Sequence, residues 1–140
     1  WYKDYKTGIN LMKKKYLIVI ANYYKDISRG LLDSALKKIP KNNLIKTIKV
    51  PGVFEIPVTI SKNIKKYDGF LALGCVIKGE TPHFDFISVS TTNAIMNLSI
   101  NHKKPIGNGI ITCLNMRQAK VRKKKGAEAA DAVMSILSQK

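Results

Sequence analysis

Residues 78–83 (KGETPH) gather side chains that could bind a small anion and move protons beside it. The glycine lets a backbone amide approach a ligand closely, the lysine adds a positive charge, and the threonine adds a hydroxyl. His83 ends the segment, and histidine is the usual side chain for proton transfer near neutral pH. We interpret the loop as a site for proton chemistry on an anionic substrate. An ordinary strand-to-helix turn is the open alternative.

Residues 51–57 (PGVFEIP) form a second candidate segment, in which Glu55 is expected at the start of a helix. The helix dipole favours a carboxylate there, and that carboxylate can accept hydrogen bonds from a polyhydroxy ligand. Glutamate occurs only at positions 55, 80 and 128, so two of the three fall in these segments. A simple capping role for Glu55 is the alternative. Tyr23 could stack on a flat heterocycle or be a half-buried aromatic residue.

Four cations at residues 122–125 (RKKK) stand before Gly126 and a predicted helix. Basic residues beside a helix N-terminus suit a phosphate group. We select Arg122 as the phosphate ligand, because the chain has arginine only at positions 29, 117 and 122. For Lys123 and Lys124 a solvated turn is the preferred interpretation.

The net charge of +16 over 140 residues comes almost entirely from lysines spread along the chain. Nucleic-acid readers rely on arginine and interleaved aromatic residues, so we expect solvated faces and no nucleic-acid partner. The positive field would still attract phosphorylated substrates. No apolar run approaches the roughly 18 residues of a membrane span, and residues 1–15 lack the apolar centre of a signal peptide. We expect a cytoplasmic protein without membrane contact.

Cys75 and Cys113 are the only cysteines, and each lies in or just after an apolar run, which favours buried free thiols. A zinc site formed with His83 and His102 is disfavoured, because the four positions lack the close paired spacing of structural zinc sites. A nucleophilic pair of Cys75 and His83 is a weaker alternative.

These segments must be positioned by alternating strands and helices. Strands are predicted at residues 16–21, 45–50, 70–75 and 106–112. Helices are predicted from Asp26 or Ser28 to residue 39, from about 55 to 64, and at 83–102, 115–122 and 126–137. The order implies a three-layer α/β/α sandwich with a four-stranded parallel sheet, formed by residues 16–140 as one domain after an N-terminal arm of residues 1–15. Residues 22–24, 51–57, 78–83 and 112–115 follow the carboxyl ends of the four predicted strands, where such folds bind ligands, and this favours an enzyme.

With these segments in order, the chain resembles the lumazine synthase (6,7-dimethyl-8-ribityllumazine synthase) family. The resemblance spans residues 16–137 and rests on IVIANYY (18–24), VPGVFEIP (50–57), LGCVIKGETPHFDF (73–86), GNGIIT (107–112) and KGAEAA (125–130). It implies a flavodoxin-like fold and a transferase of riboflavin biosynthesis. Its substrates would be 5-amino-6-(D-ribitylamino)uracil and 3,4-dihydroxy-2-butanone 4-phosphate, and no metal or redox cofactor is implied.

The resemblance also assigns a role to each candidate residue. Tyr23 would stack on the pyrimidine; Val53, Phe54 and Glu55 would bind the ribityl chain; Cys75, Val76 and Ile77 would line the pyrimidine pocket; Glu80 and Thr81 would form the phosphate-binding turn; His83 would transfer protons; and Arg122, with Lys125 nearby, would bind phosphate from a neighbouring subunit. A homopentamer with sites between subunits is implied, with a sixty-subunit capsid as a further assembly.

The sequence departs from the family pattern at two places near the predicted site. Asn108 stands in the pyrimidine region where many members carry an aromatic residue, and the segment between Arg122 and Gly126 is shorter than usual. These departures keep open a flavin- or lumazine-binding relative with weak catalysis. A basic nucleic-acid-binding module is the remote alternative.

Overall fold

Two apolar strands, β1 (Lys15–Ala21) and β3 (Gly69–Ile77), occupy the centre of a parallel sheet in the computed structural model, which describes residues 13–139. Nearly all their residues are buried, as expected for strands covered on both faces. The edge strands are β2 (Leu44–Val50) and β4 (Ile106–Cys113), and the strand order is β2-β1-β3-β4. The order reverses direction between β1 and β3, which is the switch point where such sheets bind ligands.

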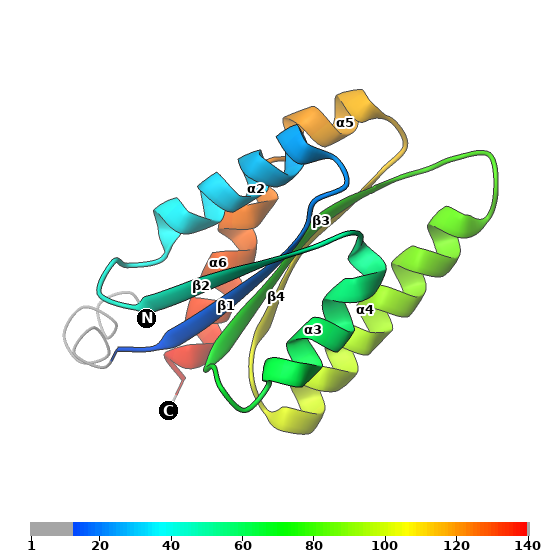
Figure 1. Cartoon of the computed structure of the whole chain (residues 1–140). Helices are drawn as coiled ribbons and strands as arrows, with labels where there is room; N and C mark the ends of the chain where they lie inside the picture. Colours follow the sequence, from blue (N-terminus) through cyan, green and yellow to red (C-terminus); the bar gives the residue numbers. More distant parts are fainter. Residues whose placement is uncertain (1–12, 140) are drawn as a thin grey trace.

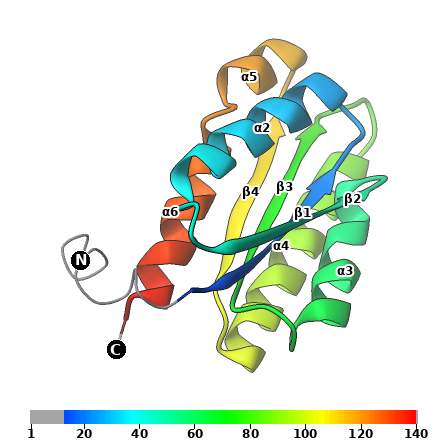
Figure 2. The ribbon, with the colours of Figure 1, turned by 60° about the vertical axis from the view of Figure 1, so that its left-hand side comes forward.

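Helices cover both faces of the sheet, as Figures 1 and 2 show. One face carries α2 (Lys25–Lys38), α5 (Met116–Val121) and α6 (Lys125–Leu137). The other carries α3 (Ile56–Asn63), preceded by the short 3-10 helix η2 (Val53–Glu55), and α4 (His83–His102). The predicted three-layer, flavodoxin-like α/β/α fold with four parallel strands is confirmed. Among the described helices, none combines the length and apolar character needed to cross a membrane.

The sheet separates two apolar cores. One is packed between the sheet and the α2–α6 layer, and the other lies between the sheet and the α3–α4 layer. Side chains of β1 alternate between them, with Ile18 and Ile20 in the first and Leu17 and Val19 in the second. This alternation follows from the two-residue repeat of a strand and fixes the register of the sheet.

Two glycines permit close approach of α6 to its neighbours. A Cβ atom at Gly107 would collide with the backbone of Ala129, and one at Gly126 would collide with the backbone of Leu31. Glycine at position 107 of β4 therefore permits close packing of α6 on the sheet. Ser34 closes the same contact, because its hydroxyl donates to the Lys123 carbonyl (2.9 Å) and accepts from the Ala127 N–H (3.1 Å).

Several element boundaries differ from the sequence-based prediction. Asp26 and Ser28 do not cap α2; the helix begins at Lys25 after Tyr24, since the buried hydroxyl of Ser28 donates to the Ala21 carbonyl at the end of β1. The strand predicted to end at Cys75 continues to Ile77 in β3, because β4 pairs with it that far. Helix α6 begins at Lys125 rather than at Gly126.

The predicted N-terminal arm comprises residues 1–15, and its residues 1–12 lie outside the described part of the chain. Of the remaining three residues, Lys15 already belongs to β1.

Candidate active site

A cavity of about 640 Å³ opens at the carboxyl ends of β1, β2 and β3 and at the start of α4. We call it the aromatic cavity. Eight of the predicted site residues line it: Tyr23, Val53, Phe54, Glu55, Cys75, Val76, Ile77 and His83. Four separate segments of the sequence thus meet at the carboxyl ends of the strands, where the sequence analysis predicted a site.

Backbone hydrogen bonds hold the loops around this cavity. The N–H of Asn22, just after β1, donates to the Val50 carbonyl at the end of β2 (2.9 Å). The N–H of Lys78, just after β3, donates to the Cys113 carbonyl at the end of β4 (2.9 Å). The loops therefore leave the sheet in fixed directions, and Tyr23 is held at the cavity with 74% of its surface exposed.

Glu55 stands at the helix start where the sequence predicted it, as the last residue of η2 and the residue before α3. Its carboxylate oxygen Oε1 accepts a hydrogen bond from the Gly52 N–H at 3.0 Å. The capping interpretation of Glu55 is thus observed. The same contact fixes the carboxylate in the wall of the aromatic cavity.

Cys75 gives the cavity an uncharged wall. Burial, with smaller effects of the neighbouring Cys113 thiol, raises the pKa of Cys75 to about 12. The thiolate is the nucleophilic form of cysteine, so a thiol that stays protonated at neutral pH argues against a nucleophilic pair of Cys75 and His83. The two cysteines are free thiols, as the sequence predicted.

The loop before α4 is exposed and ends in a turn made by Thr81. Its hydroxyl accepts a hydrogen bond from the His83 N–H (3.3 Å), which begins the helix. A Cβ atom added at Gly79 would meet nothing within 4 Å, so packing within the described residues does not demand glycine there. Glu80 and Thr81 line neither of the two cavities described in this section.

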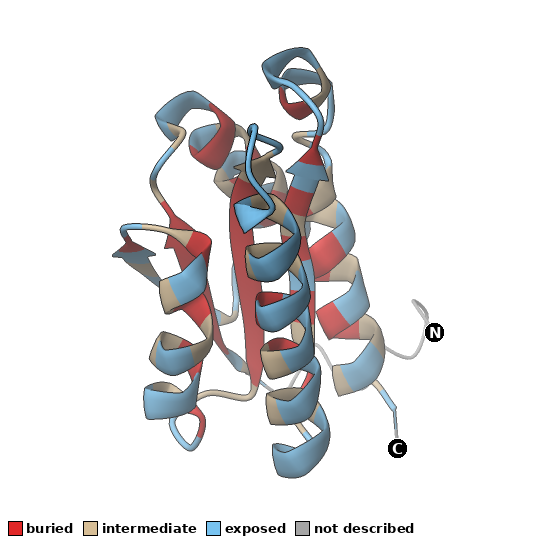
Figure 3. Cartoon of the chain, turned by 90° about the vertical axis from the view of Figure 1, so that its right-hand side faces the viewer, coloured by how far each residue is buried: buried red, intermediate tan, exposed pale blue. Residues whose placement is uncertain are grey.

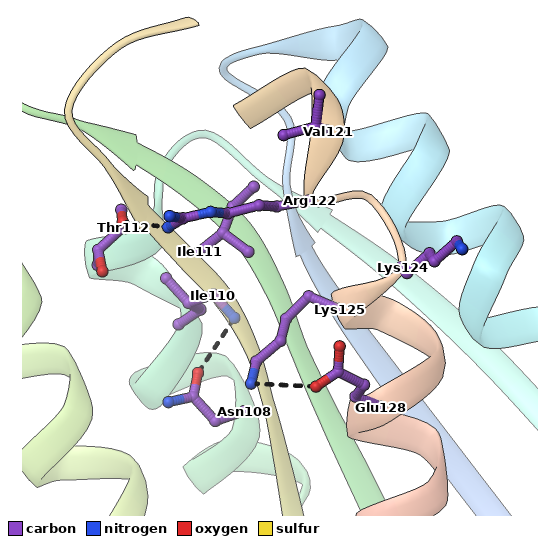
Figure 4. Close-up of a pocket in the computed structure, with 9 residues that line it drawn as sticks. All are labelled: Asn108, Ile110, Ile111, Thr112, Val121, Arg122, Lys124, Lys125 and Glu128. Carbon is purple, nitrogen blue, oxygen red and sulfur yellow. Dashed lines mark hydrogen bonds and ion pairs between the residues drawn. The ribbon is translucent and has the colours of Figure 1, made fainter. Parts of the chain in front are cut away.

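A second cavity, of about 560 Å³, lies along β4 beside the turn from α5 to α6. We call it the cationic cavity. The Arg122 guanidinium crosses the end of β4 and donates to the Thr112 carbonyl at 3.4 Å, while Lys125 forms an ion pair with Glu128 at 3.7 Å (Figure 4). Asn108 accepts a hydrogen bond from the Ile110 N–H at 3.1 Å. Lys124 points away from Arg122 and Lys125 (Figure 4).

The structure thus divides the predicted site residues, apart from Glu80 and Thr81, between two cavities that share no lining residue. Asn108, Arg122 and Lys125 belong to the cationic cavity, apart from His83 and the rest. The lining residues to which sequence reasoning gave no role include Tyr24, Ile87 and Glu128. Tyr24 adjoins a selected residue, and Glu128 follows Lys125 by one helical turn, which are the signals that could have identified them.

The zinc site that the sequence made arithmetically possible is not assembled. Among residues 13–139, no three histidine, cysteine, aspartate or glutamate side chains lie close enough to hold a metal ion.

Named proteins resemble this sequence over most of its length. The sequence profile of the 6,7-dimethyl-8-ribityllumazine synthase family matches residues 13–140. The protein of that name from Bartonella tribocorum is 41% identical, and the match covers 92% of this chain and 93% of the relative. The corresponding protein from Agrobacterium fabrum is 38% identical over 93% of this chain and 97% of the relative. A third, from Cutibacterium acnes, is 35% identical over 94% and 85%.

The fold and the cavity at the switch point of its sheet define an α/β protein with a cavity at the carboxyl ends of its strands. The chain belongs to the 6,7-dimethyl-8-ribityllumazine synthase family.

Proposed function

We propose that this chain is a transferase of riboflavin biosynthesis acting in the cytoplasm. It condenses 5-amino-6-(D-ribitylamino)uracil with 3,4-dihydroxy-2-butanone 4-phosphate to give 6,7-dimethyl-8-ribityllumazine, with release of phosphate and water. The observation that carries this proposal is the aromatic cavity, which brings eight predicted residues together at the switch point of the sheet.

The aromatic cavity suits the uncharged, ring-containing substrate. Tyr23 exposes a ring that can stack on the pyrimidine, and the protonated thiol of Cys75 places no charge against it. One oxygen of Glu55 is held by Gly52, and the other is available to hydroxyls of the ribityl chain. Val53 and Phe54 supply the apolar wall beside that chain, and Val76 and Ile77 extend the pocket along the end of β3.

His83 is the proton-transfer residue in this proposal. An amine of the pyrimidine attacks the ketone, water leaves as the imine forms, phosphate is eliminated, and the ring closes with loss of a second water. Each step needs a proton added or removed, which a histidine at the cavity wall can supply near neutral pH. Holding two substrates in contact supplies a large part of the acceleration.

The phosphate group is bound by two sets of residues. Glu80 and Thr81 form the turn beside His83, and Arg122 and Lys125 lie in the cationic cavity. Because the two cavities of one chain share no residue, we place the cationic cavity of a neighbouring chain against the aromatic cavity. A complete site then lies between two subunits of a homopentamer. A sixty-subunit capsid would be built from such pentamers.

Helix α4 supplies a surface for this assembly. Only Thr91 and Ile95 of its twenty residues are buried (Figure 3). An exposed apolar stripe runs along it at heptad-like spacing, formed by Phe86, Val89, Met96 and Ile100, with exposed fractions of 57–66%. Such spacing favours packing between helices of neighbouring copies.

A charge in this stripe should separate the subunits. We expect Met96→Glu to convert the assembly to monomers in light scattering and to lower activity with it, because the shared site is lost. Leu36→Glu, at an exposed apolar position of α2, is the matched control and should keep the assembly. A wild-type protein that is a stable, active monomer would contradict the shared site.

The reaction itself is tested by mixing the protein with both substrates. We expect saturable formation of lumazine, followed by absorbance and fluorescence, above the uncatalysed background. Tight binding of lumazine without acceleration would instead support the flavin- or lumazine-binding alternative, with Asn108 as the first position to restore to an aromatic residue.

A further inference from the structure

Tyr24 is a residue of the aromatic cavity to which the proposed condensation gives no task. It precedes α2, and its ring is partly buried against the core of the α2–α6 layer. Its carbonyl accepts a hydrogen bond from the Ser28 N–H at 2.9 Å, and Ser28 in turn donates to the Ala21 carbonyl. These bonds tie the backbone at the start of α2 to the end of β1, and the Tyr24 ring packs against the core beside them.

Tyr23 stands in contrast, because its side chain is 74% exposed. Its ring meets that of Tyr24 edge to face, with centroids 4.9 Å apart and planes at 83°. This geometry is attractive, because the positive edge of one ring lies over the negative face of the other. The partly buried ring of Tyr24 thus supports the exposed ring of Tyr23 at the mouth of the cavity.

We propose that Tyr24 is a positioning residue that orients the Tyr23 ring for stacking on the pyrimidine substrate. The inference rests on the proposed function, since it takes Tyr23 to be the stacking residue. A side chain that is oriented before binding loses less rotational freedom when the ligand arrives, so the ligand binds more tightly.

The ring of Tyr24 carries this role, because the contact with Tyr23 is between the two rings. Burial, with smaller effects of Cys75 and Tyr23, raises the pKa of Tyr24 above its ordinary value of 10.0. The phenol is therefore uncharged at the pH where the enzyme would work. Phenylalanine, which keeps the ring, should replace tyrosine here.

The kinetic test places Tyr24→Leu and Tyr24→Phe in the wild-type chain and in a Tyr23→Leu chain. We expect Tyr24→Leu to raise KM for the pyrimidine about 3- to 10-fold, the size of one edge-to-face contact, with KM for the butanone phosphate unchanged. Tyr24→Phe should stay within about twofold of wild type. In the Tyr23→Leu chain, Tyr24→Leu should add nothing further.

Tyr67→Leu is the matched control. Tyr67 forms a similar edge-to-face pair with Phe70, at 6.1 Å, where the chain enters β3 at the opposite end of the sheet. Its loss should leave both KM values unchanged, and thermal unfolding checks the fold of each variant. The proposal is overturned if Tyr24→Leu has the same effect with and without Tyr23, if it has no effect, or if Tyr24→Phe is equally harmful.

A measurement without substrates separates this inference from the proposed function. In a Trp1→Phe chain carrying Tyr23→Trp, the anisotropy decay of the single indole reports how far the side chain at position 23 moves. We expect restricted motion, kept by Tyr24→Phe and lost with Tyr24→Leu. Equal motion in all three chains refutes the positioning role. If the indole motion is restricted in this way but the wild-type protein forms no lumazine, the proposed function is refuted and the contact between the two side chains is kept.

Discussion

The aromatic cavity and the cationic cavity are made from different parts of one chain and differ in the charge of their linings. The first lies where β1, β2 and β3 end, and its wall includes the protonated thiol of Cys75. The second lies along the edge strand β4, and its lining holds three cations, Arg122, Lys124 and Lys125, and one carboxylate, Glu128, which pairs with Lys125. The proposed function assigns the first cavity to a neutral ring and the second to a phosphate ester. On that proposal, a complete site needs two chains.

The largest effect should come from the cationic cavity. Removing the guanidinium in Arg122→Ala should raise KM for the butanone phosphate about 10- to 100-fold, the size of a charge-assisted hydrogen bond. KM for the pyrimidine should change little. Steady-state kinetics with each substrate varied in turn measures both. Arg117→Ala, which removes an exposed arginine of α5 that lines neither cavity, is the control. Equal increases in KM for both substrates would contradict the assignment of one substrate to each cavity.

A smaller effect is expected at the border between the two substrates. His83→Ala should lower kcat about tenfold while the protein remains active, because water can take over part of the proton transfer while proximity is kept. His102→Ala removes the only other histidine, at the far end of α4, and should leave kcat unchanged. Complete loss of activity in a folded assembly of His83→Ala would show that His83 does more than move protons.

The smallest effect concerns the protonated thiol in the aromatic cavity. The folded pKa of Cys75, about 12, lies above the ordinary value of 9.0, so the unfolded chain loses this proton first as the pH rises. The neutral thiol therefore contributes stability in full below about pH 9, and this contribution declines between pH 9 and 12. Urea unfolding should show stability falling less steeply between pH 9 and 10.5 in Cys75→Ala than in wild type. Identical slopes would mean that Cys75 titrates normally in the folded protein.

The strands and the loops that follow them were predictable, because each depends on the types of a few consecutive residues. The apolar runs at residues 16–21 and 70–75 were predicted as strands, and the loops after β1, β2 and β3 contained Tyr23, Glu55 and His83, respectively. Boundaries were less predictable, since competing contacts decided them. The helix was predicted to start at Asp26 or Ser28, but α2 begins at Lys25, and the Ser28 hydroxyl donates to the carbonyl of Ala21, a partner seven residues earlier that only the folded chain brings close.

The sequence by itself determined the three layers, the parallel strands and the candidate residues at the carboxyl ends of the strands. It also determined the family that the chain resembles. These depend on hydrophobic periodicity and on short motifs, which act over a few neighbouring residues. Only the tertiary structure decided that the candidates fall into two cavities, that Glu128 pairs with Lys125, and that Tyr24 meets Tyr23 edge to face. These contacts depend on the directions of the side chains and of the loops that leave the sheet. Packing and hydrogen bonds between distant segments fix those directions, as in the bond from the Lys78 N–H to the Cys113 carbonyl.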